Sequence, residues 1–377
     1  MLKYLCQRII VAISGLNVVL YNICNTKYKK NALLVYILDP YIYDYKSNVH
    51  QAFEQVKVIA KTISECGYNV DLIDYRASKI KLNKCYDAVF DVRMKNNPIY
   101  INYIGENTKR IVYFTESEAS FANSAELERI EDVKRRRGAE LKPRRQVPMV
   151  DPIVEKSDLA IMIGSKYNFD TYNKFYFKKS AIVPNTGYNF NFVFDKNYKK
   201  STSYIFFGSA GSVHKGLDLL LEVFSELGSP YKLYVCGYFE REEDFVEEYY
   251  DELFNTPNII PIGFLDIMSD RFRELSNECA FTLLPSCSEG CAGSIVTCMS
   301  AGIIPICSRN CGYDDNEVIT LADCKKETIK QAIIDASNMS MKDIENKSIE
   351  VVELTKTKYC IENYKSLMHD ALKAVLK

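Results

Sequence analysis

The chain has 377 residues, of which 47% are apolar and 26% charged, so it is long enough for two or three domains with packed cores. Its 48 lysines and arginines nearly balance its 49 aspartates and glutamates, which argues against a protein that coats nucleic acid. Its 13 cysteines include no CxxC pair and match no common zinc spacing, so we expect reduced thiols and a cytoplasmic protein.

Residues 1–30 form an N-terminal segment in which apolar residues recur at helical spacing. Residues 9–26 carry no charge, but polar residues interrupt them, whereas a membrane-spanning helix needs about 20 mostly apolar residues. We therefore expect an amphipathic helix. It would lie either on a membrane surface or on the protein's own first domain.

Apolar runs and helical patterns alternate along the rest of the chain. Strands are expected at 32–38, 70–73, 88–92, 111–114, 159–163 and 181–183, and, after a linker over 188–203, at 204–207, 232–236, 258–262, 281–284 and 304–307. Helices are expected between them, including 124–137, 216–227, 240–254, 268–279 and 294–301, and from 325 to the C-terminus. This alternation predicts an α/β protein with two Rossmann-like domains that face a central cleft, each built on a parallel sheet.

The strand at 204–207 runs into a loop of small residues, Gly208 to Gly216, which precedes an apolar helix. Small residues let backbone N–H groups approach an anion, the helix N-terminus adds partial positive charge, and Lys215 adds a full charge. The pattern fits neither GxGxxG nor GxxxxGK[ST]. It predicts a phosphate site, with a glycine-rich turn beside a solvated lysine as the alternative.

A second loop of this kind, Pro285 to Ser294, follows the strand at 281–284. Its backbone amides would form another anion site at a helix start. Glu289 lies inside it, and a carboxylate repels phosphate. We expect Glu289 to bind a neutral group such as a sugar hydroxyl, or else to satisfy N–H groups at the start of the helix.

Three blocks of the chain together resemble the glycosyltransferase group 1 family in order and spacing: residues 181–194, 208–224 and 284–305. The resemblance implies a GT-B fold. It implies an acceptor-side domain at 31–187, a nucleotide-sugar donor domain at 188–355, and a C-terminal helix at 356–377 that crosses back to the first domain.

The resemblance also implies roles for single residues. Lys215 would hold the donor diphosphate, and Glu289 the hydroxyls of the donor sugar. The rest of the donor site would comprise Gly208, Ser209, Gly211, Gly263, Phe264, Gly290, Cys291, Ala292, Gly293 and Thr297. Two of these depart from the family pattern: Ser209 stands where an arginine is usual, and Thr297 where a ribose-binding glutamate is usual.

Candidates on the acceptor side lie where expected strands end or the first long helix begins. Arg93 follows the third strand, Glu116 and Glu118 follow the fourth, and His50 precedes the helix. A run of seven basic residues, Lys134 to Arg145, would be a solvated face, or would meet an anionic acceptor or the acidic membrane leaflet.

The resemblance therefore implies a retaining, metal-independent glycosyltransferase with a nucleotide diphosphate sugar as donor and no further cofactor, and we expect it in the cytoplasm at the inner face of the membrane. The acceptor would be a glycan or a lipid-linked sugar in surface polysaccharide synthesis, and no nucleic-acid partner is expected. Two alternatives stay open: a non-catalytic nucleotide- or glycan-binding protein, which Ser209 and Thr297 favour, and a nucleotide-sugar epimerase.

Overall fold

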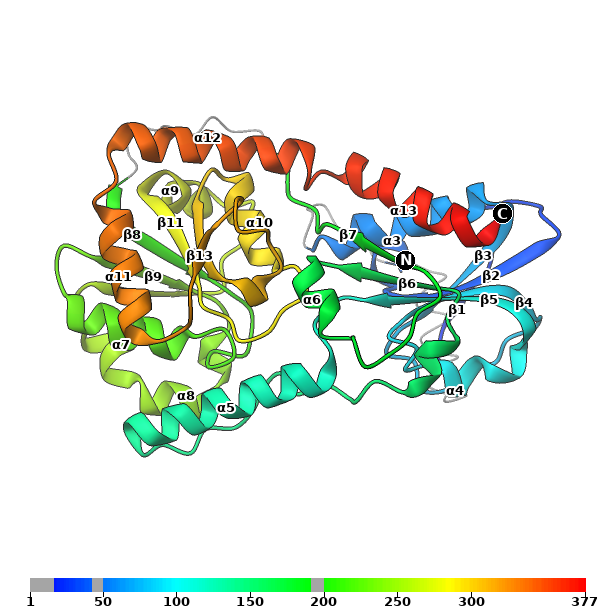
Figure 1. Ribbon diagram of the computed structural model, residues 1–377, viewed down its shortest axis with the longest axis horizontal. Coiled ribbons are helices and arrows are strands. Elements are labelled where there is room, and N and C mark those ends of the chain that lie inside the picture. Colours follow the sequence, from blue (N-terminus) through cyan, green and yellow to red (C-terminus); the bar gives the residue numbers. More distant parts are fainter. Residues whose placement is uncertain (1–16, 43–49, 191–199) are drawn as a thin grey trace.

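A computed structural model describes residues 17–42, 50–190 and 200–377 and contains two sheets (Figure 1). In the described residues the first sheet has seven strands in the order β1-β3-β2-β4-β5-β6-β7. Every neighbouring pair is parallel except β1 and β3. The strands are β1 (Val19–Leu20), β2 (Lys30–Tyr36), β3 (Tyr68–Asp74), β4 (Tyr86–Val92), β5 (Ile104–Phe114), β6 (Leu159–Ile163) and β7 (Ser180–Val183).

The second sheet, over the same described residues, has six parallel strands in the order β10-β9-β8-β11-β12-β13. They are β8 (Lys200–Phe207), β9 (Lys232–Cys236), β10 (Ile259–Gly263), β11 (Cys279–Leu284), β12 (Ile304–Ser308) and β13 (Ile319–Leu321). The expected parallel α/β fold is confirmed. The three-residue strand β13 was not expected, because it is too short to show a pattern.

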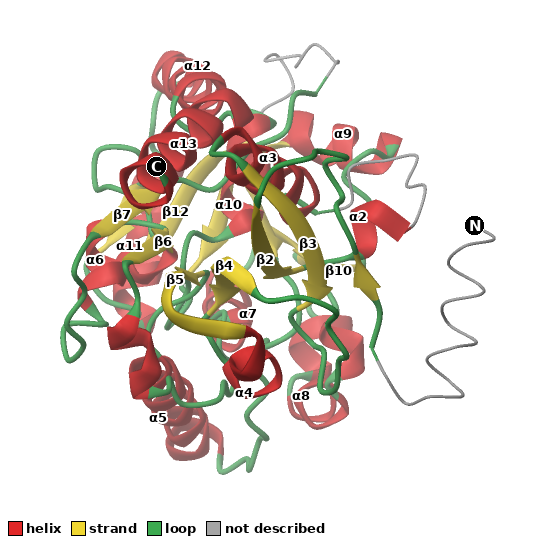
Figure 2. Ribbon diagram, turned by 90° about the vertical axis from the view of Figure 1, so that its right-hand side faces the viewer, coloured by secondary structure: helices red, strands yellow, loops and turns green. Residues whose placement is uncertain are grey.

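Helices cover both faces of the sheets, which is why consecutive strand residues such as Leu33 and Leu34 are both fully buried. Figure 2 shows α3 and α13 on one side of the first sheet and α4 on the other. The helices of the first half are α2 (Asp39–Ile42), α3 (Ala52–Glu65), α4 (Asn97–Tyr100), α5 (Ala119–Arg137) and α6 (Lys166–Asp170). Those of the second half are α7 (Leu217–Leu227), α8 (Glu243–Glu248), α9 (Asp270–Glu278), α10 (Gly293–Ser300), α11 (Lys326–Ser337), α12 (Met341–Thr357) and α13 (Ile361–Leu376).

The helix expected over 240–254 is wrong in its extent. It is divided into α8 and two short helical turns, Phe239–Arg241 and Asp251–Asn255. The chain leaves helical geometry at Glu242, whose φ is −108° and ψ is 74°. There the Glu242 carboxylate turns inward and accepts hydrogen bonds from the backbone N–H groups of Gly211 and Ser212.

Two helices link the halves in opposite directions (Figure 1). Helix α13 returns to the first sheet, where the hydroxyls of Tyr364 and Tyr113 lie 3.1 Å apart and Lys179 Nζ donates to Ala374 O at 2.8 Å. Helix α5 begins beside the first sheet and ends against the second half, where Arg137 pairs with Glu248 at 2.6 Å.

The expected amphipathic helix is wrong for residues 17–26, and its earlier part, residues 1–16, lies outside the described residues. Val19 and Leu20 instead form the edge strand β1 beside β3. Asn22 N donates to Asp71 Oδ1 and Ile23 N to Val70 O. The edge of β3 offers backbone N–H and C=O groups that pair with these residues. This pairing decides their structure although their apolar residues recur at helical spacing. Within the described residues, no helix is long and apolar enough to cross a bilayer.

The basic run is a solvated face only in part: Lys134, Arg135, Lys142 and Arg144 are exposed, whereas Arg136, Arg137 and Arg145 are half-buried. Four of its arginines are held by carboxylates: Arg135 by Asp132, Arg136 by Asp132, Asp218 and Glu222, Arg137 by Glu248 and Glu252, and Arg144 by Asp244. Most of these carboxylates belong to the second half of the chain. Through Arg136, Arg137 and Arg144 the run therefore joins the two halves.

Candidate active site

The strand order of the second sheet reverses between β8 and β11, which lie side by side and parallel. Ligands of open α/β sheets bind at the carboxyl ends of the strands at such a reversal. The loop after β8 contains Lys215, and the loop after β11 contains Glu289. The topology therefore brings together the two loops that the sequence analysis selected.

Lys215 and Glu289 form an ion pair. Lys215 Nζ lies 2.6 Å from Glu289 Oε1, and the two side chains are only 6% and 11% exposed. Ser286 Oγ donates to the same carboxylate oxygen at 3.0 Å. Burial raises the pKa of Glu289, but the positive charges of Lys215 and Arg145 outweigh it and hold this pKa at about 2. The carboxylate is thus ionised at neutral pH and compensates the lysine.

A buried histidine fastens the two loops to each other. His214 Nε2 donates to Ser288 O at 2.6 Å, and Nδ1 lies 3.5 Å from the thiol of Cys287. Burial lowers the pKa of His214 to about 4 and raises that of Cys287 to about 12, so both groups are neutral at pH 7. Sequence reasoning missed this pair, for which the only signal was the position of His214 beside Lys215.

Several expected anion-binding amides are already used. Gly211 N and Ser212 N donate to the buried Glu242 carboxylate at 2.6 and 3.1 Å. Ala292 N donates to Cys311 O at 2.9 Å. In this structure the amides of Gly211 and Ala292 are therefore occupied by the protein's own acceptors, and their contact with a donor stays a prediction. Ser209 is exposed in the first loop, and Gly208 N continues the sheet by donating to Cys236 O.

The first half of the chain holds the Glu289 loop from the opposite side. The carbonyl of Glu289 accepts from Ser117 N at 3.1 Å, Ser117 Oγ at 2.6 Å and Asn168 Nδ2 at 3.0 Å. A methyl group on Gly290 would collide with the carbonyl of Thr115, so a glycine is required there. Asn185 Nδ2 donates to the carbonyl of the buried Cys291 at 2.8 Å. Sequence reasoning missed Ser117 and Asn168, which follow β5 and β6.

Arg93 and Glu116 are brought together at the carboxyl ends of β4 and β5, where they form an ion pair. Arg93 and the following Met94 have φ of 61° and 54°. Residues other than glycine rarely adopt a positive φ, because it strains the backbone. Such strained residues are concentrated at functional sites. Glu118 has a different role, since it caps α5 through Ser120 N and pairs with Lys174 at 3.1 Å.

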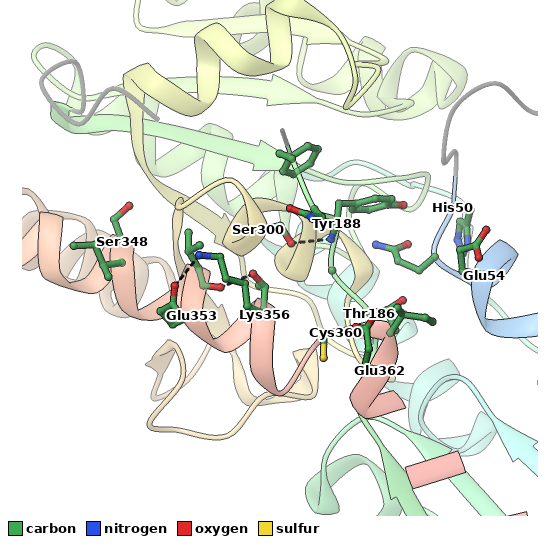
Figure 3. A pocket seen from close by; sticks show the side chains of 18 residues that line it. His50, Glu54, Thr186, Tyr188, Ser300, Ser348, Glu353, Lys356, Cys360 and Glu362 are labelled. Atoms are coloured by element: carbon green, nitrogen blue, oxygen red, sulfur yellow. Dashed lines mark hydrogen bonds and ion pairs between the residues drawn. The ribbon is translucent and has the colours of Figure 1, made fainter. Parts of the chain in front are cut away.

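Thr297 lies on α10 and faces the first half of the chain. Its hydroxyl donates to Gly293 O at 2.7 Å and accepts from Gln51 Nε2 at 3.1 Å. His50, next to Gln51, lines a cavity of about 720 Å³ between α3, the segment after β7, and α12 (Figure 3). Arg93 and Glu116 do not line this cavity, so His50 is not brought together with the other acceptor-side candidates.

Gly263 is the last residue of β10, Phe264 follows it, and both lie beside the loop after β9. Gly237 N donates to Gly263 O at 2.9 Å. The ring of Phe264 is 59% exposed and stacks on Tyr238 with 5.1 Å between centroids. Arg241 covers the Tyr238 ring at 4.1 Å. An aromatic surface thus lies at the carboxyl end of β10, at the edge of the sheet.

Comparison with known proteins agrees with this arrangement. Residues 190–368 match the family model described as glycosyl transferases group 1. The chain has the GT-B fold, and its second half is a group 1 glycosyltransferase domain. The predicted family and fold are thus confirmed. No curated protein sequence matches the chain.

Three solved structures illustrate the shared fold. Sucrose-phosphate synthase from Thermosynechococcus elongatus has a TM-score of 0.64 at 13% identity, over 92% of this chain and 99% of that one. HepE from Anabaena, determined with UDP and glucose, has a TM-score of 0.57 at 11% identity, over 92% and 100%. TarM has a TM-score of 0.53 at 11% identity, over 74% of this chain. The chain spans only about half of the length of TarM, 54%.

Proposed function

We propose that this protein is a glycosyltransferase that moves a sugar from a nucleoside diphosphate donor to a glycan or lipid-linked acceptor. In this proposal the anomeric configuration is retained and no metal ion or other cofactor is needed. The observation that carries it is the buried Lys215–Glu289 pair at the strand reversal of the group 1 domain. The donor diphosphate bound to HepE supports this choice of donor class.

Each partner of the pair has one task. Lys215 binds the diphosphate and stabilises the negative charge that develops on it as the bond to the sugar breaks, which is where electrostatic catalysis acts. Glu289 accepts hydrogen bonds from sugar hydroxyls and orients the sugar. The acceptor hydroxyl then attacks from the side of the leaving group. The buried hydrogen bond from His214 to Ser288 O holds the two loops in fixed positions relative to each other during the transfer.

The acceptor side is assigned to the carboxyl ends of β4 and β5. Arg93 and Glu116 lie there as a strained ion pair, and a polar acceptor would exchange hydrogen bonds with both. We place the reaction in the cytoplasm at the membrane face, where a lipid-linked acceptor of surface polysaccharide synthesis would be reached. The buried thiols of the second half support a reducing compartment.

A panel of nucleotide sugars tests the proposal. The purified protein is incubated with each donor and a mixture of glycan and lipid-linked acceptors, and released nucleoside diphosphate and labelled product are measured. Transfer with one donor is expected. Conversion of the donor sugar into its epimer, or binding without release, would overturn the proposal and favour the epimerase or the non-catalytic binding protein.

A further inference from the structure

The side-chain charges at the proposed donor site nearly cancel. Glu289 compensates Lys215, and Glu116 compensates Arg93. The amides of Gly211 and Ser212, which would otherwise face a phosphate, donate to Glu242. A nucleoside diphosphate carries at least two negative charges. The groups considered so far therefore leave it without a free cation.

Arg145 supplies a cation that no carboxylate of the described residues pairs with. It is the last arginine of the basic run, and the arginines before it are paired. Within residues 17–42, 50–190 and 200–377, its guanidinium has no ion pair. The side chain lies on the glycine loop after β8: a methyl group on Gly211 would be 2.5 Å from Arg145 Cγ and 3.1 Å from Cδ.

The electrostatics agree with this position. The positive charge of Arg145 contributes to the lowered pKa values of both Glu289 and His214, so it acts on the two loops at once. Arg145 also lowers the pKa of Arg93, after the larger effect of burial. The charge of Arg145 thus acts on both loops of the Lys215–Glu289 pair, and its side chain lies against Gly211 of the first loop.

Helix α5 holds the segment that carries Arg145. The carboxylate of Glu126, which is 1% exposed, accepts from Arg144 N and Arg145 N at 2.8 Å each and from Gln146 Nε2 at 2.8 Å. Asn123 bonds Val147 through both its N–H and its carbonyl. The backbone is therefore fixed on both sides of Arg145, and its direction toward Gly211 is built into the fold.

We infer that Arg145 binds the diphosphate of the donor, so that the first half of the chain contributes a cation to the nucleotide site of the second. The guanidinium suits this task because its planar N–H donors bind phosphate oxygens in pairs. This inference rests on the proposed function, since it names a further residue for the same donor.

Calorimetric titration of UDP, GDP and ADP, and of the matching monophosphates, tests the inference with three variants. Arg145→Ala should weaken binding of the preferred diphosphate about 10- to 100-fold, the usual effect of losing charge-assisted bonds, and that of its monophosphate less. Arg145→Lys should recover part of the loss. Arg144→Ala is the matched control, because the neighbouring Arg144 pairs with Asp244, and it should bind as the wild type does.

Two outcomes overturn the inference and are distinguishable. If the wild type binds a diphosphate and a folded Arg145→Ala variant binds it equally well, Arg145 is not in the site, while the proposed function stands. If the wild type binds none of the three diphosphates, the proposed function and the inference fail together. An equal loss for diphosphate and monophosphate would assign Arg145 a structural role and would also contradict the inference.

Discussion

At the scale of single residues, the proposed catalytic pair is also a structural pair. Lys215→Ala should lower kcat/KM about 30- to 1000-fold, because a diphosphate contact worth about 2–4 kcal/mol is lost. It should also lower the free energy of unfolding by about 3–5 kcal/mol, since Glu289 is left buried without its partner. Steady-state kinetics and urea unfolding measure the two effects.

The double variant Lys215→Met with Glu289→Gln separates these effects. It removes both charges of the pair, so the stability should recover while transfer stays impaired. Near-normal kcat/KM in the single Lys215→Ala variant would exclude Lys215 from the site.

Asp91 predicts how stability depends on pH. It is fully buried on β4, and burial raises its pKa to about 8 from an ordinary 3.8, although the Tyr100 hydroxyl donates to it at 2.8 Å. The folded protein thus holds a proton there that the unfolded chain releases above pH 4. The stabilisation is complete below about pH 4 and is lost as the pH rises toward 8.

Asp91→Asn should therefore flatten the decline of Tm between pH 4 and pH 8, measured by thermal unfolding. The control is Asp370→Asn, which changes a carboxylate that is 76% exposed. If both variants keep the wild-type slope, Asp91 is ionised in the folded protein.

At the scale of elements, helix α5 acts as a brace between the two halves. Its Arg136 pairs with Asp218 at 2.7 Å and with Glu222 at 3.2 Å, and Asp218 is fully buried at the start of α7. Arg136→Ala should cost about 3–5 kcal/mol in the free energy of unfolding at pH 7, because the buried Asp218 carboxylate loses its ion-pair partner, whereas Glu222 keeps Lys326 at 3.1 Å.

Arg135→Ala is the comparison for this brace. Arg135 is 63% exposed and pairs with Asp132 alone, so its loss should cost no more than about 1 kcal/mol. Equal effects of the two variants in urea unfolding would mean that α5 does not hold the halves together.

At the scale of the whole molecule, the two halves meet directly at the Glu289 loop. Asn168 Nδ2 donates to Glu289 O and to Asn310 O, both at 3.0 Å. Asn168→Ala should favour a more open arrangement, since each lost bond is worth about 1 kcal/mol. We expect a larger radius of gyration in small-angle scattering and a higher KM for the donor.

The control for this prediction is Asn255→Ala. Asn255 bonds only Asp251 on the surface, in the same half of the chain. An unchanged radius and KM in Asn168→Ala would show that the contact does not limit opening.

Much of the fold was predictable from the sequence, because it depends on patterns among residues that are close in the sequence. Buried parallel strands read as continuous apolar runs, so β6 and β9 were predicted to the residue. The glycine loops that contain Lys215 and Glu289 were also recognisable, because small residues before an apolar helix form a pattern within about ten positions.

The errors came from long-range partners. Residues 17–26 have helical spacing, but the free edge of β3 recruits them. The helix over 240–254 breaks where Glu242 turns to Gly211, 31 residues earlier in the chain. The basic run reads as a solvated face until Asp218, Glu222, Glu248 and Asp244 are brought beside it.

The sequence by itself determined the α/β class, the two loops of the strand reversal and the resemblance to group 1 glycosyltransferases, because these depend on short-range patterns of size and polarity. Only the tertiary structure decided which charges remain free. Within the described residues Lys215 has a carboxylate partner and the Arg145 guanidinium has none, and this depends on which carboxylates fold against each cation. A charge acts through its distance in space, and that distance between the two halves of the chain exists only after both have folded.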